Sequence, residues 1–438
     1  MHEAVIAPSL SALGELQAAA ANTPFALFGI RIEFIFFALT LLGVALFHRY
    51  TLYVALTGLV VITGYKLLFT TYDVPAHFLG GGGDEGEWGL ILNLLGLLVG
   101  FALLAKHFED SQLPELLPRW LPNDWRGGFV LLLLVCFISS FLDNIAAAMI
   151  GGTVAKVVYK NKVHVGYLAA LVAASNAGGA GSVVGDTTTT MIWLDGVNPW
   201  DVTHAFVGSA VAILFFGVIA ARQQDRHQRI EADPRGGVRI DAGRLFVVAL
   251  ILAGAIITNV MSVHGKQFGF PALGVWAAIL LCAPFRKPAW HEIVPALKGA
   301  AFLLSLVWCA SLMPVNELPQ ASWHTALGLG FVSAVFDNIP LTKLAIDQGG
   351  YDWGFLAYAV GFGGSMIWFG SSAGVALCNN FPEGKSVYQW LKSGWHVTVG
   401  YVLGFFALYF IMGWQPHAPH KAAKLDPTNM EAPARAGH

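Results

Sequence analysis

Two stretches of this 438-residue chain, FISSFLDNIAAAMI at 137–150 and FVSAVFDNIPLTKLAI at 331–346, place an Asp-Asn pair in the middle of an apolar run. Apolar runs recur along the whole chain, in which 56% of the residues are hydrophobic and only 12% are charged. A soluble domain carries roughly 25% charged residues, whereas a helix that spans a bilayer needs about 20 consecutive apolar residues. The composition therefore predicts an all-α polytopic membrane protein.

The two Asp-Asn pairs interrupt segments that would otherwise cross the membrane. A carboxylate at the centre of a straight helix is costly when it faces lipid, and Pro340 breaks the second run further. Non-helical backbone at membrane depth is tolerated only where protein or water covers it. We therefore expect re-entrant hairpins over 127–159 and 324–346, with the Asp-Asn pairs at their tips.

The remaining apolar runs predict ten full crossings, and the basic residues orient them. When the arginine-rich loop 222–244 is placed in the cytoplasm, the cytoplasmic ends hold 17 Lys and Arg residues outside the tails and membrane segments, and the external loops hold only Lys266. This layout predicts a multi-pass protein of a bacterial-type inner (plasma) membrane, with the C-terminus external. The ten crossings are expected at 26–46, 51–69, 88–106, 165–194, 204–221, 244–262, 269–285, 299–315, 354–378 and 394–414.

The chain divides into two similar membrane halves of opposite orientation. The segment SNAGGAGSVVGDTTTT at 175–190 corresponds to GFGGSMIWFGSSAG at 361–374, and each follows an Asp-Asn hairpin. The first hairpin enters from the cytoplasm and the second from outside, which predicts an inverted repeat with two discontinuous helices, the plan of a secondary transporter with its site at the midplane. The expected parts are an N-terminal segment 1–25, a first half 26–221, a basic loop 222–243, a second half 244–414 and a polar tail 415–438.

Polar residues cluster at the predicted breaks and form the candidate site. Each of its three aspartates can cap a half-helix or bind an ion, and its asparagines can form turns or offer carbonyl oxygens. The neighbouring glycines either allow close packing or free backbone carbonyls for a ligand, and we expect Thr189 and Thr190 to bond to carbonyls of their own helix. The candidate ligands are Asp143, Asn144, Ser175, Asn176, Ser182, Asp186, Thr187, Thr188, Asp337, Asn338, Ser365, Ser371 and Ser372.

This set consists of hard oxygen donors, which suit Na⁺ or Li⁺ better than soft metals. Desolvation favours the protonated form of a buried carboxyl group, so one group can hold either a proton or a cation, which is the minimal chemistry of an antiporter. Four scattered cysteines give no zinc site or disulfide framework, and the glycine runs do not match a P-loop. We expect no cofactor, no enzymatic activity and no nucleic-acid partner; the partners are the bilayer and the transported cations and protons.

At these residues the chain resembles the ion transporter superfamily and, within it, sodium/proton antiporters of the NhaD type. The motifs that carry the resemblance are LDN at 142–144, NAGGAGSVVGDTTTTMIW at 176–193, SAVFDNIPL at 333–341 and GGSMIWFGSSAGVA at 363–376. The resemblance implies Na⁺ (or Li⁺) exchange for H⁺ by alternating access. It also implies a homodimer in which a transport domain moves against a scaffold.

Lys343, six residues after Asp337, leaves a second interpretation open. It can snorkel to the interface, pair with a carboxylate, or attract an anionic substrate, as in a citrate- or arsenite-like carboxylate or oxyanion transporter. The three aspartates weigh against an anion. An intramembrane enzyme lacks a Ser/His or paired-Asp motif, and a channel fits an inverted repeat less well than alternating access does.

Overall fold

The computed structural model describes most of the two membrane halves. The N-terminal segment up to residue 24, the tail from residue 418, and Arg49, Arg119, Arg235 and Lys266 of the charge pattern lie outside the described residues. The described residues are 25–27, 29–47, 50–80, 86–116, 121–231, 239–263 and 271–417.

The described part is predominantly helical, as expected, and its strands form one short two-stranded ribbon. Five helical runs are long and apolar enough to cross a membrane: α3 (Thr51–Phe69), α5 (Trp88–Glu109), α11 with α12 (Trp200–Thr203 and Ala205–His227), η2 with α15 (Trp290–Glu292 and Ile293–Ser311) and α21 (Trp395–Met412). Shorter apolar helices are α2 (Ile32–Leu46), α7 (Trp125–Ser139), α8 (Asn144–Val158), α9 (Val165–Gly179), α14 (Pro271–Cys282) and α18 with η4 (Trp353–Ala357 and Tyr358–Phe362). In α13 (Ala242–Val263) the part Ala242–Thr258 is a further apolar helical segment.

The other elements are short and lie at helix breaks or connections. They are α4 (Val74–Leu79), α6 (Leu113–Leu116), α10 (Thr187–Leu194), η3 (Val315–Glu317), α16 (Trp323–Ser333), α17 (Asn338–Gln348), α19 (Ser372–Asn380), η5 (Pro382–Lys385) and α20 (Val387–Ser393). The crossing expected from residue 26 instead begins with a two-stranded ribbon, β1 (Ala26–Leu27) and β2 (Ile30–Arg31). Gly29 turns this ribbon with φ 78°, a conformation that glycine adopts without strain.

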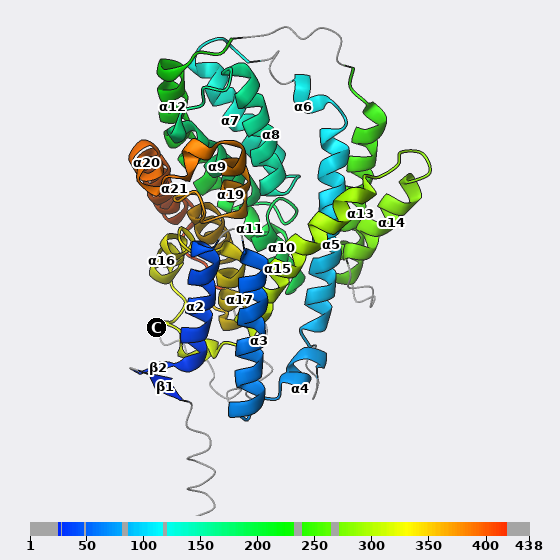
Figure 1. Ribbon diagram of the computed structural model, residues 1–438, viewed down its shortest axis with the longest axis vertical. Helices are drawn as coiled ribbons and strands as arrows, with labels where there is room; N and C mark the ends of the chain where they lie inside the picture. Colours follow the sequence, from blue (N-terminus) through cyan, green and yellow to red (C-terminus); the bar gives the residue numbers. More distant parts are fainter. Residues whose placement is uncertain are drawn as a thin grey trace, which may run out of the picture.

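The helices fall into two groups by their packing. The first, which we call the scaffold group, contains α2, α3, α5, α13, α14 and α15; the second, the core group, contains α7–α12 and α16–α21. Figure 1 shows α5, α13 and α14 on the right of the view, α7, α9, α12, α20 and α21 toward the upper left, and α2 and α3 below them. The main contact between the groups is made by α15 with α17.

Four helix breaks occur inside the core group, and a side chain caps the helix that follows each one. Asp143 accepts a hydrogen bond from the amide of Ile145 at 2.8 Å before α8, and Asp337 accepts one from Ile339 at 3.0 Å before α17. The same role is taken by Asp186 before α10 and by Ser371 before α19. These caps satisfy amides that the broken helices leave without a partner.

The same backbone approach recurs at matching positions in the two halves. A Cβ at Gly178 would collide with the carbonyl oxygen of Cys136, and a Cβ at Gly363 would collide with that of Gly330. Because glycine has no Cβ, the backbone of α7 can approach that of α9, and the backbone of α16 can approach the end of η4.

A matching hydrogen bond accompanies each approach. The hydroxyl of Ser139 donates to the carbonyl oxygen of Ser175 at 2.5 Å, and the hydroxyl of Ser333 donates to that of Val360 at 2.7 Å. Both bonds are buried, so they hold each hairpin firmly against its neighbouring broken helix.

Candidate ion-binding cavity

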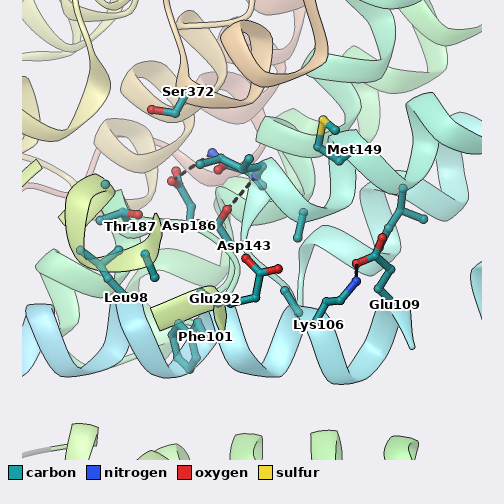
Figure 2. Close-up of a pocket in the computed structure, with 18 of the residues that line it drawn as sticks. Leu98, Phe101, Lys106, Glu109, Asp143, Met149, Asp186, Thr187, Glu292 and Ser372 are labelled. Atoms are coloured by element: carbon teal, nitrogen blue, oxygen red, sulfur yellow. Dashed lines mark hydrogen bonds and ion pairs between the residues drawn. The ribbon is translucent and has the colours of Figure 1, made fainter. Parts of the chain in front are cut away.

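A cavity of about 640 Å³ lies between the core group and the scaffold helices α5 and α15. It extends from the capped starts of α8, α10, α17 and α19 to the end of α5 that leads into α6. Figure 2 shows Asp186 and Thr187 toward one side of the cavity, Lys106 and Glu109 toward the other, and Asp143 and Glu292 between them. Six predicted ligands line it: Asp143, Asn144, Asp186, Thr187, Asn338 and Ser372.

Asp186 is the most confined of the acidic groups in the cavity. Its exposed fraction is 2%, and its Oδ1 accepts hydrogen bonds from the amide of Thr188 and from Asn144 Nδ2, both at 3.4 Å. Its Oδ2 is buried and has no hydrogen-bond partner among the described residues. A buried carboxylate oxygen without a partner is strongly unfavourable, so this oxygen is suited to carry a proton or to bind a cation.

Asn144 is held in place by a second asparagine, which joins the two halves. Its Nδ2 donates to Asn176 Oδ1 at 3.0 Å, and Asn176 Nδ2 donates in turn to Ser365 Oγ at 2.9 Å and Ser371 Oγ at 3.2 Å. Asn176, Ser365 and Ser371 do not line the cavity, so they support the wall behind it.

Asn338, at the tip of the second hairpin, is fixed by the opposite half of the chain. Its Nδ2 donates to Thr188 Oγ1 at 3.1 Å, and the residue lines the cavity. The Nδ2 atoms of Asn144 and Asn338 donate hydrogen bonds to neighbouring residues. We therefore expect the Oδ1 atom of each asparagine to be the one that binds a ligand.

The other predicted ligands do not reach the cavity. Asp337 is not among the lining residues, and the hydroxyl of Ser372, which does line the cavity, donates to Asp337 Oδ2 at 3.4 Å. Ser175 donates to the carbonyl oxygen of Val172 at 2.9 Å, and Ser182 donates to that of Ser140 at 2.6 Å. Both hydroxyls therefore stabilise the backbone around the breaks.

Thr189 and Thr190 behave as expected, since each hydroxyl donates to the carbonyl oxygen of Asp186 at 2.9 Å. Thr190 also lines the cavity, which the sequence analysis did not anticipate. Thr190 lies one helical turn after Asp186, the residue that caps α10, and this spacing was the available signal.

Three carboxylates toward the outer end of the cavity were also missed. Glu109, Glu231 and Glu292 line it together with Lys106. Lys106 pairs with Glu109 at 2.7 Å, and Glu231 pairs with Lys160, whose ammonium holds the pKa of Glu231 below its usual value. These residues come from distant segments, so no local sequence pattern could have grouped them.

Lys343 does not line the cavity, and it is fully buried elsewhere. Its Nζ lies 2.9 Å from Glu87 Oε1 and 2.7 Å from Asp347 Oδ1. Of the three roles considered for this lysine, the structure shows pairing with carboxylates.

Among the described residues, no group of three or more His, Cys, Asp or Glu side chains is arranged to hold a metal ion. The four cysteines are all free thiols. A cation bound in this cavity would therefore be held mainly by one or two carboxylates and by neutral amide and hydroxyl oxygens, as in discontinuous-helix transporters.

Long apolar helices, capped breaks within the core and a cavity that reaches the buried Asp186 are typical of an integral membrane transporter. A model of the family described as "CitMHS: Citrate transporter" matches residues 25–418. The chain therefore belongs to this citrate transporter family.

Several curated relatives confirm the resemblance to NhaD-type antiporters. "Sodium/proton antiporter 1" of Arabidopsis thaliana is 27% identical over 317 residues, which cover 64% of this chain and 52% of the relative. "Na(+)/H(+) antiporter NhaD" of Alkalimonas amylolytica is 25% identical over 364 residues, covering 69% and 74%. The NhaD of Vibrio cholerae is 25% identical over 367 residues, covering 71% and 76%. The chain thus spans about half the length of the plant relative and about three quarters of the bacterial ones.

Proposed function

We propose that this protein exchanges Na⁺ or Li⁺ for H⁺ across the membrane by alternating access. The observation that carries the proposal is the buried Asp186 Oδ2, which has no hydrogen-bond partner among the described residues and lies in a cavity shared with Asp143. A proton or a cation bound to Asp186 Oδ2 offsets the cost of burying this oxygen without a partner. Only one of the two can bind to it at a time. Competition for the carboxylates then couples cation entry to proton release.

The charge of the cavity favours a cation over a carboxylate substrate. Its lining includes the carboxylates of Asp143, Asp186, Glu109, Glu231 and Glu292, against the single ammonium of Lys106. A cleft of one charge sign concentrates ions of the opposite sign. Among the described residues that line the cavity, Lys106 is the only Lys or Arg and it pairs with Glu109, while Lys343 lies outside the cavity and pairs with Glu87 and Asp347. This arrangement disfavours a citrate-like anion.

Two matched features support an inverted repeat with re-entrant hairpins. They are the close backbone approaches at Gly178 and Gly363 and the buried hydrogen bonds donated by Ser139 and Ser333. The basic residues favour a cytoplasmic position for loop 222–243 and an external C-terminus. In this orientation the cavity mouth at Glu109 and Glu231 faces the cytoplasm. A homodimer is proposed from the resemblance to NhaD-type antiporters.

The proposal is tested with the purified protein in proteoliposomes that carry an internal pH dye. We expect proton flux when Na⁺ or Li⁺ is added and no uptake of radiolabelled citrate. The variant Lys343→Met, which keeps the stem length without the charge, should retain cation/proton exchange. Citrate uptake by the wild type that collapses in Lys343→Met would overturn the proposal in favour of an anion transporter.

A further inference from the structure

A buried ion pair connects the second hairpin to the scaffold group. Lys343 lies on α17 and has an exposed fraction of 0%, and Glu87, at 5%, is the residue directly before α5. Their charged atoms are 2.9 Å apart. Figure 1 shows α17 and the α4 end of α5 at the end of the molecule opposite α6.

The second partner of Lys343 belongs to the hairpin itself. Asp347 is four residues further along α17, and its Oδ1 lies 2.7 Å from Lys343 Nζ. The two carboxylates therefore differ in kind, because Asp347 moves with the lysine whereas Glu87 is fixed to α5. If α17 separated from α5, Asp347 would still neutralise the buried lysine, which avoids the high cost of an unpaired buried charge.

The surface around this ion pair is closed, in contrast to the surface of the first hairpin. Leu344 and Phe336 pack against a cluster formed by α2, α3 and α15, including Leu306 and Cys309. On the first hairpin, Met149 of α8 instead faces the cavity. The cavity thus separates the first hairpin from the scaffold group, while apolar packing and an ion pair hold the second hairpin to it.

We propose that the Lys343–Glu87 ion pair is a latch that keeps the pathway on the Glu87 side closed while the Glu109 side is open. The inference rests on the proposed function only through alternating access. Opening the Glu87 side requires α17 to leave α15, and this movement breaks the bond to Glu87 but leaves the bond to Asp347 intact. Breaking the latch therefore shifts the population toward the opposite-facing state.

The test uses two cysteine reporters in the full chain, with the four native cysteines replaced by alanine. Leu344→Cys reports on the closed surface and Met149→Cys reports on the cavity. Each is labelled with a membrane-impermeant maleimide, from outside in intact cells and from the cytoplasmic side in inverted vesicles. We expect Glu87→Gln to raise the external labelling rate of Leu344→Cys about tenfold, a shift of about 1.4 kcal/mol, and to lower the cytoplasmic labelling of Met149→Cys.

Two matched variants separate a latch from general loosening. Asp347→Asn removes the carboxylate that neutralises Lys343 after α17 leaves α5, so it should not raise the external labelling rate of Leu344→Cys and should not lower the cytoplasmic labelling of Met149→Cys. Glu33→Gln removes a buried carboxylate that pairs with Lys66 at 3.2 Å inside the scaffold group, and it should behave likewise. The proposal is overturned if Glu87→Gln leaves Leu344→Cys unreactive, if Met149→Cys does not respond, or if either control matches Glu87→Gln. Labelling needs no transported ion, so this result is independent of ion identity.

Discussion

The two hairpins carry the same Asp-Asn tip but are held in different surroundings. Asp143, at the first tip, lines the cavity, whereas Asp337, at the second, does not line it and accepts a hydrogen bond from Ser372. The Asn144 amide bonds to residues of its own half, Asn176 and Asp186, and the Asn338 amide reaches across to Thr188. The tips are thus alike in sequence and in capping, and unlike in access.

The two hairpins also differ in their contact with the scaffold group. Both aspartates accept a hydrogen bond from the amide two residues later, at 2.8 and 3.0 Å. Only the second hairpin packs firmly on α15 and is tied to α5. Under alternating access the first hairpin would pack against the scaffold group when the second separates from it. Each Asp-Asn tip would then contact the ion in one of the two states.

The largest expected effect comes from removing the charge of either tip. Asp143→Asn and Asp337→Asn keep a side-chain oxygen that can cap α8 or α17 but remove the carboxylate. Loss of a buried charge contact costs about 2–5 kcal/mol, so we expect cation/proton exchange in proteoliposomes to fall by roughly 30-fold or more for each variant.

Folding of both variants is checked by size-exclusion chromatography and thermal unfolding, which should match the wild type. Wild-type exchange by either folded variant would mean that its aspartate is only a helix cap. If Asp143→Asn alone fails, the two tips are not equivalent and the first hairpin contains the whole site.

A smaller effect is expected where the halves differ in sequence, at Asp186 and its counterpart Ser371. Asp186→Asn keeps the cap but removes the acid whose Oδ2 has no partner among the described residues. We expect this variant to lose the pH dependence of exchange while it retains cation binding, measured by calorimetry at two pH values. Ser371→Asn is the matched control, because it changes the equivalent cap without removing an acid, and its pH profile should follow the wild type. An unchanged pH profile in Asp186→Asn would assign the proton to another group.

Local features of the site could be predicted from the sequence because they are short-range. An acid or serine directly before a helical run in an apolar segment indicates a cap, and Asp143, Asp186, Asp337 and Ser371 all take this role. The same reasoning placed Asn144 beside the first tip.

Orientation and distant pairing could not be predicted. Ser182 and Ser175 have the right chemistry, but their rotamers direct the hydroxyls to backbone carbonyls. The partner of Lys343 is 256 residues away in the chain, and the ribbon at 26–31 depends on a turn at Gly29 inside an apolar run. Each of these outcomes depends on the tertiary structure, which the sequence pattern does not encode locally.

The smallest expected effect is at the mouth of the cavity that the first hairpin lines. Glu231 is solvent-exposed, and the ammonium of Lys160 holds its pKa below the usual value. The carboxylate is therefore fully charged above the ordinary glutamate pKa, and its charge is lost only as the pH falls through the lowered value. Glu231→Gln should slow cation loading about two- to threefold at low ionic strength, because it weakens the attracting field.

The effect should vanish at high salt, since exposed charges are screened beyond about 3 Å at 1 M ionic strength. Stopped-flow measurement of exchange at neutral pH, in low and high choline chloride, checks both expectations. Glu383→Gln is the matched control, because Glu383 is an exposed glutamate that does not line the cavity. A salt-independent loss in Glu231→Gln would assign this carboxylate a direct role in binding, and the open mouth would then be part of the site rather than its approach.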